Sequence, residues 1–353
     1  MVGLGLIVLY SAGYATAQSK ASMKYDPYYY IKNQAMYAGL GVIAMYFISK
    51  IDYHIYKKFT WLIYGGTMVL MILTPFIGTE VKGAKRWLFG FQPSEIAKFA
   101  LILVFATLMS KMGKKRMKTF KWGFCLYMAI LASFVATLVL QKHLSAIVIL
   151  SVTAGMMMFV AGTRVLYLAT LVIMGVAGGV GYILMNPYAM ARVKVWLDPF
   201  SEFRGGGWQA SQSWIAIGSG GLWGLGLGQG RQKYLYLPEP ANDFIFSVAC
   251  EELGFIGALF ILLIFAVFII KGYFVAVKAR DKFGTLLATG ITTQIAVQVI
   301  MNICVVSGII PVTGVSLPFF SHGGTSLMML LGEVGILLSI SRQQTEEEEL
   351  EEQ

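Results

Sequence analysis

Residues Phe244–Tyr273 read FIFSVACEELGFIGALFILLIFAVFIIKGY, and they directly follow the polar segment LPEPAND, Leu237–Asp243. An α-helix needs about 20 apolar residues to cross a hydrocarbon core of about 30 Å. The quoted run is longer than that, so we expect its first turns to lie in the outer interface of a membrane. Apolar runs of about 20 residues recur from end to end of the chain. The pattern predicts an all-α polytopic integral membrane protein.

The composition supports this fold class. Of the 353 residues, 57% are hydrophobic and 13% are charged, whereas soluble domains carry about 25% charged residues. In a soluble chain the net charge of +10 would suggest nucleic acid binding, but in a membrane protein it has to be compared with topology first, and no nucleic acid partner is expected. Cys125, Cys250 and Cys304 are far apart and odd in number, so neither a disulfide framework nor a metal site is expected.

We predict ten membrane spans, with both chain ends on one side of the membrane. The spans cover approximately residues 2–17, 33–48, 59–77, 96–109, 122–140, 144–161, 165–185, 244–273, 284–306 and 324–340. No cleavable signal peptide is predicted, because the first span lacks a basic n-region and a convincing cleavage site. Polar residues usually precede the first helix of a polytopic protein, so their absence here suggests a truncated start.

Basic residues gather in the short connections between the predicted spans. They concentrate in residues 50–58, 111–121, 162–164 and 271–282, together with Arg342. By the positive-inside rule these connections and both termini face the cytoplasm. The long stretch 186–243 therefore faces outward, where ATP and NAD are absent. We predict one membrane domain, residues 1–342, followed by an acidic, disordered cytoplasmic tail, residues 343–353.

The outward stretch 186–243 is the longest segment that is neither an apolar span nor a short connection. A loop of this length is usually a functional lid or disordered, and the six aromatic residues that lie between Trp196 and Tyr236 argue against disorder. The glycine-rich run Gly218–Gly230 has no strand before it and no Lys-Ser/Thr after it, so it is not a nucleotide-binding loop. We interpret the stretch as the working part of the protein.

Charged side chains inside or beside the spans are functional candidates, because each is costly in a membrane unless it is partnered. Glu95 and Lys98 are three residues apart, so they share a helix face and form a pair that is either structural or functional. Glu333 lies about halfway along the last span, and an amide stripe on the ninth span could face it through interhelical hydrogen bonds. The predicted structural polar core is Glu252, Gln294, Gln298, Asn302 and Glu333.

Asp243 sits at a loop-to-helix junction beside Asn242, where nothing structural demands a carboxylate. An aspartate just before a helix is often only its N-cap. No Ser-His-Asp arrangement, phosphate-binding loop or metal motif accompanies Asp243. Its spacing alone therefore leaves a capping role and a catalytic role both open.

Six motifs give the chain a family resemblance. They are KGAKRWL (82–88), QPSEIAK (92–98), WLDPF (196–200), GWQASQSWIAIGSGGLWGLGLGQG (207–230), LPEPANDFIFSVACEELG (237–254) and PVTGVSLPFFSHGGTSL (311–327). In these motifs, and in their order, the chain resembles the SEDS family (shape, elongation, division and sporulation) over essentially its whole length. KGAKRWL and PVTGVSLPF are more similar to the FtsW and SpoVE members than to RodA.

The resemblance implies a peptidoglycan glycosyltransferase that polymerises lipid II, a disaccharide-pentapeptide on undecaprenyl pyrophosphate, at the outer face of the bacterial cytoplasmic membrane during cell division or sporulation. Asp243 matches the family's essential aspartate and is the candidate catalytic base. The candidate substrate-binding residues are Lys82, Lys85, Arg86, Glu95, Lys98 and Arg204. A divalent cation, Mg²⁺ or Mn²⁺, is left open as a helper, with no ligands assigned.

The resemblance also implies a partner, a class B penicillin-binding protein whose transpeptidase crosslinks the new strand within the division or sporulation machinery. Two positions depart from the family. QKHLS (141–145) stands where many members have a Pro-Asp pair, and His322 replaces a tyrosine, where we expect packing or hydrogen bonding. Two alternatives are a flippase that moves lipid II or another lipid-linked precursor across the bilayer, with Asp243 structural, and a scaffold that only recruits a partner.

Overall fold

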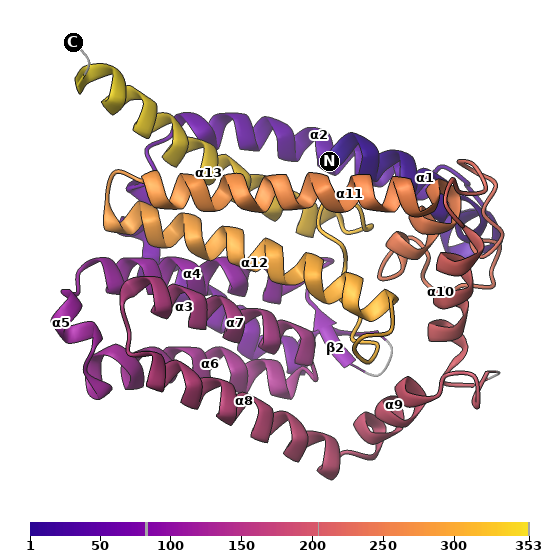
Figure 1. The fold of residues 1–353 in the computed structure, drawn as a ribbon, viewed down its shortest axis with the longest axis horizontal. Coiled ribbons are helices and arrows are strands. Elements are labelled where there is room, and N and C mark those ends of the chain that lie inside the picture. The colour runs from indigo at the N-terminus through magenta and orange to yellow at the C-terminus, as the bar shows by residue number, and fades with distance from the viewer. Residues whose placement is uncertain (82–83, 204, 352–353) are drawn as a thin grey trace. The chain divides into compact units, whose positions relative to one another are not determined.

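The structure, a computed structural model, describes residues 1–81, 84–203 and 205–351. Its regular structure is almost entirely α-helical (Figure 1). The helices at the positions of the predicted spans are α1 (Val2–Ser19), α2 (Tyr29–Lys50), α3 (Ile55–Ile77), α4 (Pro93–Ser110), α6 (Leu126–Leu140), α7 (Leu144–Ala161), α8 (Val165–Met185), α11 (Ile245–Lys278), α12 (Lys282–Val306) and α13 (Gly324–Glu351). The predicted all-α polytopic fold class is confirmed.

Within the described residues, eight of these helices are long and apolar enough to cross a membrane, namely all of them except α1 and α2. The span that contains α6 begins with a π-helical turn, Lys121–Cys125. α1 and α2 are helical where the first two spans are predicted, but they are not among the eight. α13 runs through the predicted domain boundary at residue 342, and that boundary stays a prediction.

The chain forms two compact units, each built from three separate segments. Unit 1 comprises residues 1–39, 175–267 and 298–327, and unit 2 comprises residues 40–174, 268–297 and 328–353. Segments far apart in the sequence therefore meet inside each unit. The long helices α2, α8, α11, α12 and α13 contribute to both units.

α4 is the central helix of unit 2. It packs against α3, α6 and α7 (Figure 1), and most of its side chains are buried. Pro93 begins α4, because a residue in the first helical turn needs no backbone N–H. Between α3 and α4 the chain forms a short antiparallel hairpin of β1 (Thr79–Val81) and β2 (Ala84–Trp87), which the sequence analysis does not predict.

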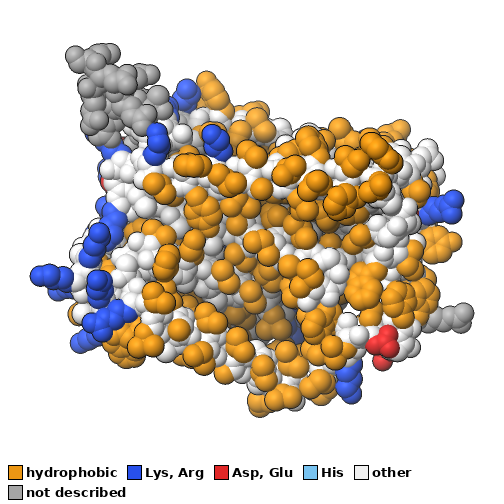
Figure 2. Space-filling view, viewed as in Figure 1, with side chains coloured by type: hydrophobic (Ala, Val, Ile, Leu, Met, Phe, Trp, Pro, Cys, Tyr) orange, Lys and Arg blue, Asp and Glu red, His pale blue; other side chains and the backbone are white. Residues whose placement is uncertain are grey.

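The basic connection 111–121 of unit 2 contains a short helix, α5 (Lys114–Met117), and all its lysine and arginine side chains are exposed. Figure 2 shows Lys and Arg side chains gathered around α5, whereas hydrophobic side chains cover the helices in this view. Such a separation is typical of a protein whose helices face lipid and whose connections face water.

Unit 1 carries the stretch 186–243 between α8 and α11. This stretch is not a single loop, because it contains α9 (Pro187–Leu197) and α10 (Trp208–Ser219) before the glycine-rich run 218–230. α11 is broken at Gly254, whose φ of 66° and ψ of −169° are not helical. The left-handed φ favours glycine at this position.

The glycine-rich run fills the break in α11 with backbone hydrogen bonds. Two N–H groups of the run donate to carbonyls before the break, and two N–H groups after the break donate to carbonyls of the run. The four donor–acceptor pairs are Leu225 to Glu251 (3.0 Å), Gly226 to Glu252 (3.0 Å), Phe255 to Gly221 (2.9 Å) and Ile256 to Leu222 (3.2 Å). Backbone groups that an unbroken helix would pair internally are thus paired with the run.

Candidate functional site

Asp243 lies two residues before the start of α11, and its side chain is half-buried. The side-chain amide of Asn302, on α12, donates hydrogen bonds to the carbonyl of Asp243 at 2.8 Å and to the carbonyl of Val315 at 2.7 Å. Asn302 is fully buried. The amide therefore fixes the loop-to-helix junction against the segment that joins α12 to α13, residues 307–323, which we call the α12–α13 loop. From the sequence, the amide side chains of Gln294, Gln298 and Asn302 on α12 are expected to face Glu333. Asn302 instead donates to the carbonyls of Asp243 and Val315.

The α12–α13 loop also holds the two residues before Asp243. The hydroxyl of Ser321 donates to the carbonyl of Asn242 at 2.6 Å. The backbone N–H of His322 donates to the carbonyl of Ala241 at 2.8 Å. Together with the bond from Asn302, these contacts hold the carbonyls of three consecutive residues. We call this arrangement the carbonyl clamp.

Two side chains of α2, Gln34 and Tyr30, contact the residues that form the carbonyl clamp. The Nε2 of Gln34 donates to the carbonyl of Ser321 at 3.0 Å, and the Oε1 of Gln34 accepts from the N–H of Gly323 at 3.1 Å. The imidazole of His322 packs edge-on against Tyr30, with ring centroids 4.8 Å apart. Burial lowers the pKa of His322 below its ordinary value. His322 therefore has the packing role expected from the sequence.

Gly314 brings the backbone of the α12–α13 loop against the carboxylate of Asp243. Its φ is +72°, and a Cβ built on Gly314 would lie 3.3 Å from the Oδ2 of Asp243. The left-handed φ and the close approach both favour glycine here. The sequence singles out the motif that contains Gly314, but only the structure shows what the glycine accommodates.

A buried ion pair joins Glu252, on the broken helix α11, to Lys233, which precedes the helix in the chain. The Nζ of Lys233 is 2.6 Å from the Oε1 of Glu252, and the two side chains are 3% and 1% exposed. The hydroxyl of Ser11, on α1, donates to that oxygen at 2.6 Å and accepts from Lys233 at 2.7 Å. The other oxygen of Glu252 accepts from the N–H of Gly228 at 3.0 Å. The pair has the additional hydrogen bonds that a buried ion pair needs to be tolerated.

The ion pair closes residues 233–252 into a loop that carries Asp243. Sequence reasoning identifies Glu252 but misses Lys233 and Ser11. Lys233 lies in irregular structure, where no helical or strand period marks a residue as buried. Its one sequence signal is its place between the glycine-rich run and LPEPAND.

The predicted pair of Glu95 and Lys98 forms at the start of α4. The Nζ of Lys98 donates to the Oε2 of Glu95 at 2.9 Å, with the side chains 3% and 14% exposed. Elsewhere in unit 2, the Nε2 of Gln294 donates to both oxygens of Glu333, at 3.2 and 2.9 Å. Gln298 is buried, and its amide oxygen has no hydrogen-bond partner among the residues that the structure describes. These groups lie in unit 2, apart from Gln298, which belongs to unit 1 with Asp243.

Two residues of the basic motif, Lys85 and Arg86, lie on β2. Arg86 donates to the carbonyls of Gln141 and Lys142, at 3.4 and 2.5 Å, and so holds the turn between α6 and α7. The Nζ of Lys85 lies 3.4 Å from the carbonyl of Phe76. The other two predicted basic residues, Lys82 and Arg204, lie outside the described residues.

His143 occupies the turn where a carboxylate is expected in many SEDS members. Its Nδ1 lies 3.5 Å from the Nε2 of Gln92, in the QPSE motif. Burial first, and then the positive charges of Arg86 and Lys98, lower the pKa of His143 to about 3. The turn therefore carries a neutral imidazole at neutral pH, and no acid–base role follows for it.

The described part of the chain contains no group of three or more His, Cys, Asp or Glu residues placed to hold a metal ion. Cys125, Cys250 and Cys304 are free thiols. We therefore assign no protein ligands to a divalent cation.

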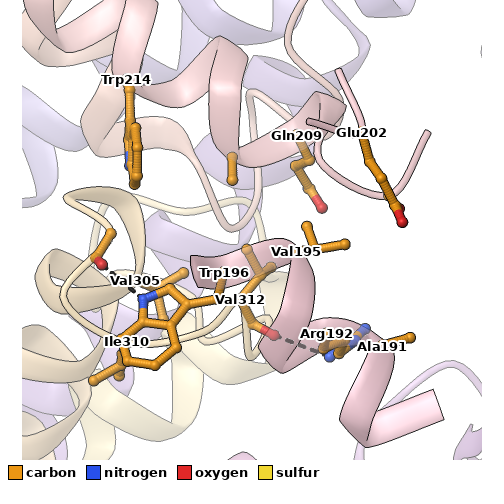
Figure 3. Close-up of a pocket in the computed structure, with 13 residues that line it drawn as sticks. Ala191, Arg192, Val195, Trp196, Glu202, Gln209, Trp214, Val305, Ile310 and Val312 are labelled. Atoms are coloured by element: carbon orange, nitrogen blue, oxygen red, sulfur yellow. Dashed lines mark hydrogen bonds between the residues drawn. The ribbon is translucent and has the colours of Figure 1, made fainter. Parts of the chain in front are cut away.

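Unit 1 also contains a cavity of about 280 Å³ between α9, α10 and the α12–α13 loop. Two hydrogen bonds tie α9 to the loop beside it (Figure 3). The Nε1 of Trp196 donates to the carbonyl of Gly308 at 2.8 Å, and Arg192 donates to the carbonyl of Val312 at 3.0 Å. The WLDPF motif thus contributes to a wall of the cavity, which the sequence alone does not indicate.

Comparison with known proteins gives three findings. The family model of FtsW, RodA and SpoVE, described as "Cell cycle protein", matches residues 1–346. Stage V sporulation protein E of Bacillus subtilis (strain 168) is 40% identical over 350 residues, which cover 97% of this chain and 94% of the relative. The probable peptidoglycan glycosyltransferase FtsW of Geobacter sp. (strain M18) is 39% identical over 343 residues, covering 96% of this chain and 92% of the relative.

Solved structures with a similar fold cover the chain equally well. A chain from the structure "Structural coordination of polymerization and crosslinking by a peptidoglycan synthase complex" matches with a TM-score of 0.76 at 24% identity, covering 97% of each chain. The Rod shape determining protein RodA of Thermus thermophilus matches with a TM-score of 0.69 at 23% identity, covering 97% of this chain and 96% of the other. At these identities the likeness is one of fold.

Proposed function

We propose a function from the premise that this chain belongs to the cell cycle protein family of FtsW, RodA and SpoVE. It is a peptidoglycan glycosyltransferase, the activity that the FtsW relative's name gives. It joins the disaccharides of lipid II into glycan strands at the outer face of the cytoplasmic membrane, in division or sporulation. Both termini lie in the cytoplasm, and the stretch that contains α9 and α10 lies outside, as the distribution of basic residues supports.

One observation carries the assignment of Asp243 as general base, namely the hydrogen bonds that hold the backbone of residues 241–243. The carbonyl clamp holds residues 241–243 by hydrogen bonds of 2.6 to 2.8 Å. A general base must stay within hydrogen-bond reach of the proton that it accepts. Holding a catalytic group in place before the reaction lowers the entropic part of the barrier. A half-buried carboxylate on a backbone held in this way supports the proposal.

The reaction then runs as a displacement at the anomeric carbon. The 4-hydroxyl of the acceptor's N-acetylglucosamine attacks the anomeric carbon of the donor's N-acetylmuramic acid, and Asp243 takes the hydroxyl proton. The bond between the anomeric carbon and the phosphate oxygen breaks. Undecaprenyl pyrophosphate leaves with the electron pair, and Asp243 passes its proton to solvent before the next turnover.

The departing pyrophosphate is highly anionic and needs cations nearby. We propose that Lys85 supplies charge, since its ammonium makes a long contact of 3.4 Å with a backbone carbonyl. Lys82 and Arg204 remain candidates for the same role. Lys98 is buried against Glu95, so we propose that this pair positions its surroundings in addition to any contact with substrate.

The test is polymerisation of labelled lipid II by the purified chain in liposomes. Asp243→Asn should abolish polymer on a gel while the protein still inserts and folds. Asp26→Asn, which alters a half-exposed carboxylate of the α1–α2 connection, should polymerise like wild type. Polymer from Asp243→Asn at nearly the wild-type yield would refute the base assignment. Exposure of label at the far leaflet without polymer would instead indicate a flippase.

We also propose that a class B penicillin-binding protein binds the membrane face of α11 and α12. In support, one solved chain of this fold comes from a complex that coordinates polymerization and crosslinking. Ile300 on α12 is 57% exposed, so Ile300→Trp should remove the gain in activity that the partner gives and leave basal activity intact. Equal activity with and without every class B protein of the cell would contradict this.

A further inference from the structure

We propose that the cavity between α9, α10 and the α12–α13 loop is a subsite for one uncharged N-acetylhexosamine ring of the substrate's sugar chain. The inference rests on the proposed function and deepens it, because it assigns a sugar-recognition site that the catalytic carboxylate does not provide. Four observations carry it: the two kinds of wall, the fixed aromatic ring, the balance of charge with the volume, and the connection to Asp243.

The cavity has one aromatic wall and one polar wall. In Figure 3 the indole rings of Trp196 and Trp214 lie on one side, and the side chains of Arg192, Gln209 and Glu202 lie toward the other. A pyranose ring has a matching division, with C–H groups on its face and hydroxyl and amide groups at its rim. Aromatic walls with a few placed polar groups are the usual construction of small-molecule sites. The walls therefore suit a sugar better than an acyl chain.

Close packing and a hydrogen bond hold the two indole rings of the aromatic wall in position. Trp214 packs so closely on Gly308, whose φ is +78°, that any Cβ at Gly308 would overlap the indole ring. Trp196 is anchored to the same residue by its hydrogen bond of 2.8 Å. A platform that is already ordered loses little conformational entropy when a ligand stacks on it.

Charge and volume exclude other parts of the substrate. Among the described lining residues, Arg192 and Glu202 contribute one charge of each sign, so the cavity offers no net positive charge to a pyrophosphate. Its volume of about 280 Å³ lies just below the range of about 300–1,000 Å³ that drug-sized ligands need. One sugar ring fits such a space, whereas the complete disaccharide-pentapeptide does not.

A single short stretch of backbone connects the cavity with the reacting group. Val312 lines the cavity, and a Cβ built on Gly314 would lie 3.3 Å from the Oδ2 of Asp243. Two residues of fully extended chain span at most about 7 Å. A ring seated in the cavity therefore lies near Asp243, which suits a subsite that sets the register of the strand.

The direct test measures binding of a soluble β-1,4-linked N-acetylglucosamine tetramer to the full chain in nanodiscs, by saturation-transfer difference NMR. Wild type and Asp243→Asn should bind alike, since the cavity does not include that carboxylate. Glu202→Ala should weaken binding by about tenfold or more, and Gln209→Ala by about three- to tenfold, as expected for one lost hydrogen bond to a charged or a neutral group. Gln229→Ala, the matched control outside the cavity, should bind like wild type.

Kinetics provide a second readout. Glu202→Ala should raise the KM for lipid II with little change in kcat, because Glu202 contributes binding and not proton transfer. Absence of tetramer binding in wild type would overturn the proposal, and so would equal losses in Gln209→Ala and Gln229→Ala. Displacement of the tetramer by inorganic pyrophosphate would also overturn it. If wild type binds the tetramer with the expected variant pattern but makes no polymer, the polymerase function fails and the saccharide site stands.

Discussion

Replacing Lys233 tests whether the buried ion pair with Glu252 stabilises the loop that carries Asp243. At the observed 2.6 Å, two unit charges attract each other by about 6 kcal/mol at an effective dielectric constant of about 20. Desolvation offsets most of this attraction, but removal of one partner leaves a buried charge uncompensated and costs about 3–5 kcal/mol. The loss of stability in Lys233→Met should lie at the lower end of this range, because Glu252 still accepts hydrogen bonds from Ser11 and Gly228.

The assay is the free energy of unfolding of the purified chain, measured by SDS titration in mixed micelles. Glu252→Gln should cost more than Lys233→Met, because it leaves a buried ammonium uncompensated. The double variant should recover at least about 1 kcal/mol relative to the sum of the single losses.

The chain offers a matched control for this experiment. The pair of Lys32 and Asp26 has nearly the same length, 2.7 Å, but its side chains are 65% and 33% exposed. Its disruption by Asp26→Asn should therefore leave the free energy of unfolding almost unchanged. Single variants of Lys233 and Glu252 that resemble this control, or losses that add in the double variant, would refute the reasoning.

Three further predictions concern other groups. Gly314→Ala places a methyl group at a left-handed φ and 3.3 Å from Asp243 Oδ2, so kcat for lipid II should fall about tenfold or more; unchanged kinetics would show that this contact does not position the carboxylate. Glu95→Gln and Lys98→Met should each lose polymerase activity, and the double variant should regain part of the lost stability, whereas additive losses in a double-mutant cycle would mean that the two do not interact. His143 has its pKa lowered to about 3 by burial, so the unfolded chain binds the proton first and stability should fall as pH drops from about 6.5 toward 3; His143→Gln should flatten that slope, and an unchanged slope would assign it to other groups.

The membrane helices are predictable because their signal is local. The length and hydropathy of a run such as α11 are enough to identify it as a membrane helix, without reference to any other part of the chain. α9 and α10 are shorter and lie among glycines and charged residues, so hydropathy does not separate them from a loop. The hairpin of β1 and β2 escapes prediction because its strands are only three and four residues long.

The residues of the candidate site likewise include some that the sequence predicts and some that it does not. The Glu95–Lys98 pair follows from helical spacing, and Asp243 stands out by its place before an apolar run and by its motif. The carbonyl clamp does not follow from the sequence, because Ser321 and Asn242 are 79 residues apart and no periodic pattern links them. In addition, several kinds of polar side chain can donate a hydrogen bond to a backbone carbonyl, so such bonds do not require one particular residue type.

The break in α11 has a consequence for the height at which the polymer forms. α11 has 34 residues and would extend about 51 Å as a continuous helix, against about 30 Å of hydrocarbon. The part before the break, Ile245–Leu253, accounts for roughly 14 Å of that length. Because the glycine-rich run pairs the backbone groups at the break, Gly254 can lie at the edge of the hydrocarbon without exposing polar backbone to lipid.

In that position Leu222 and Trp223, which are 64% and 79% exposed, would lie level with the edge, where we expect them to contact lipid. On the proposed topology, with Ile245–Leu253 along the membrane normal, the carboxylate of Asp243 would stand above them by roughly the length of that segment, about 14 Å. When the lipid tail of a substrate stays in the bilayer, its sugar lies at one height above the membrane. The pyrophosphate that joins the tail to the sugar sets this height. On the proposed function, we expect the helical segment before the break to act as a spacer that sets the height of Asp243 above the membrane to the reach of a membrane-bound sugar.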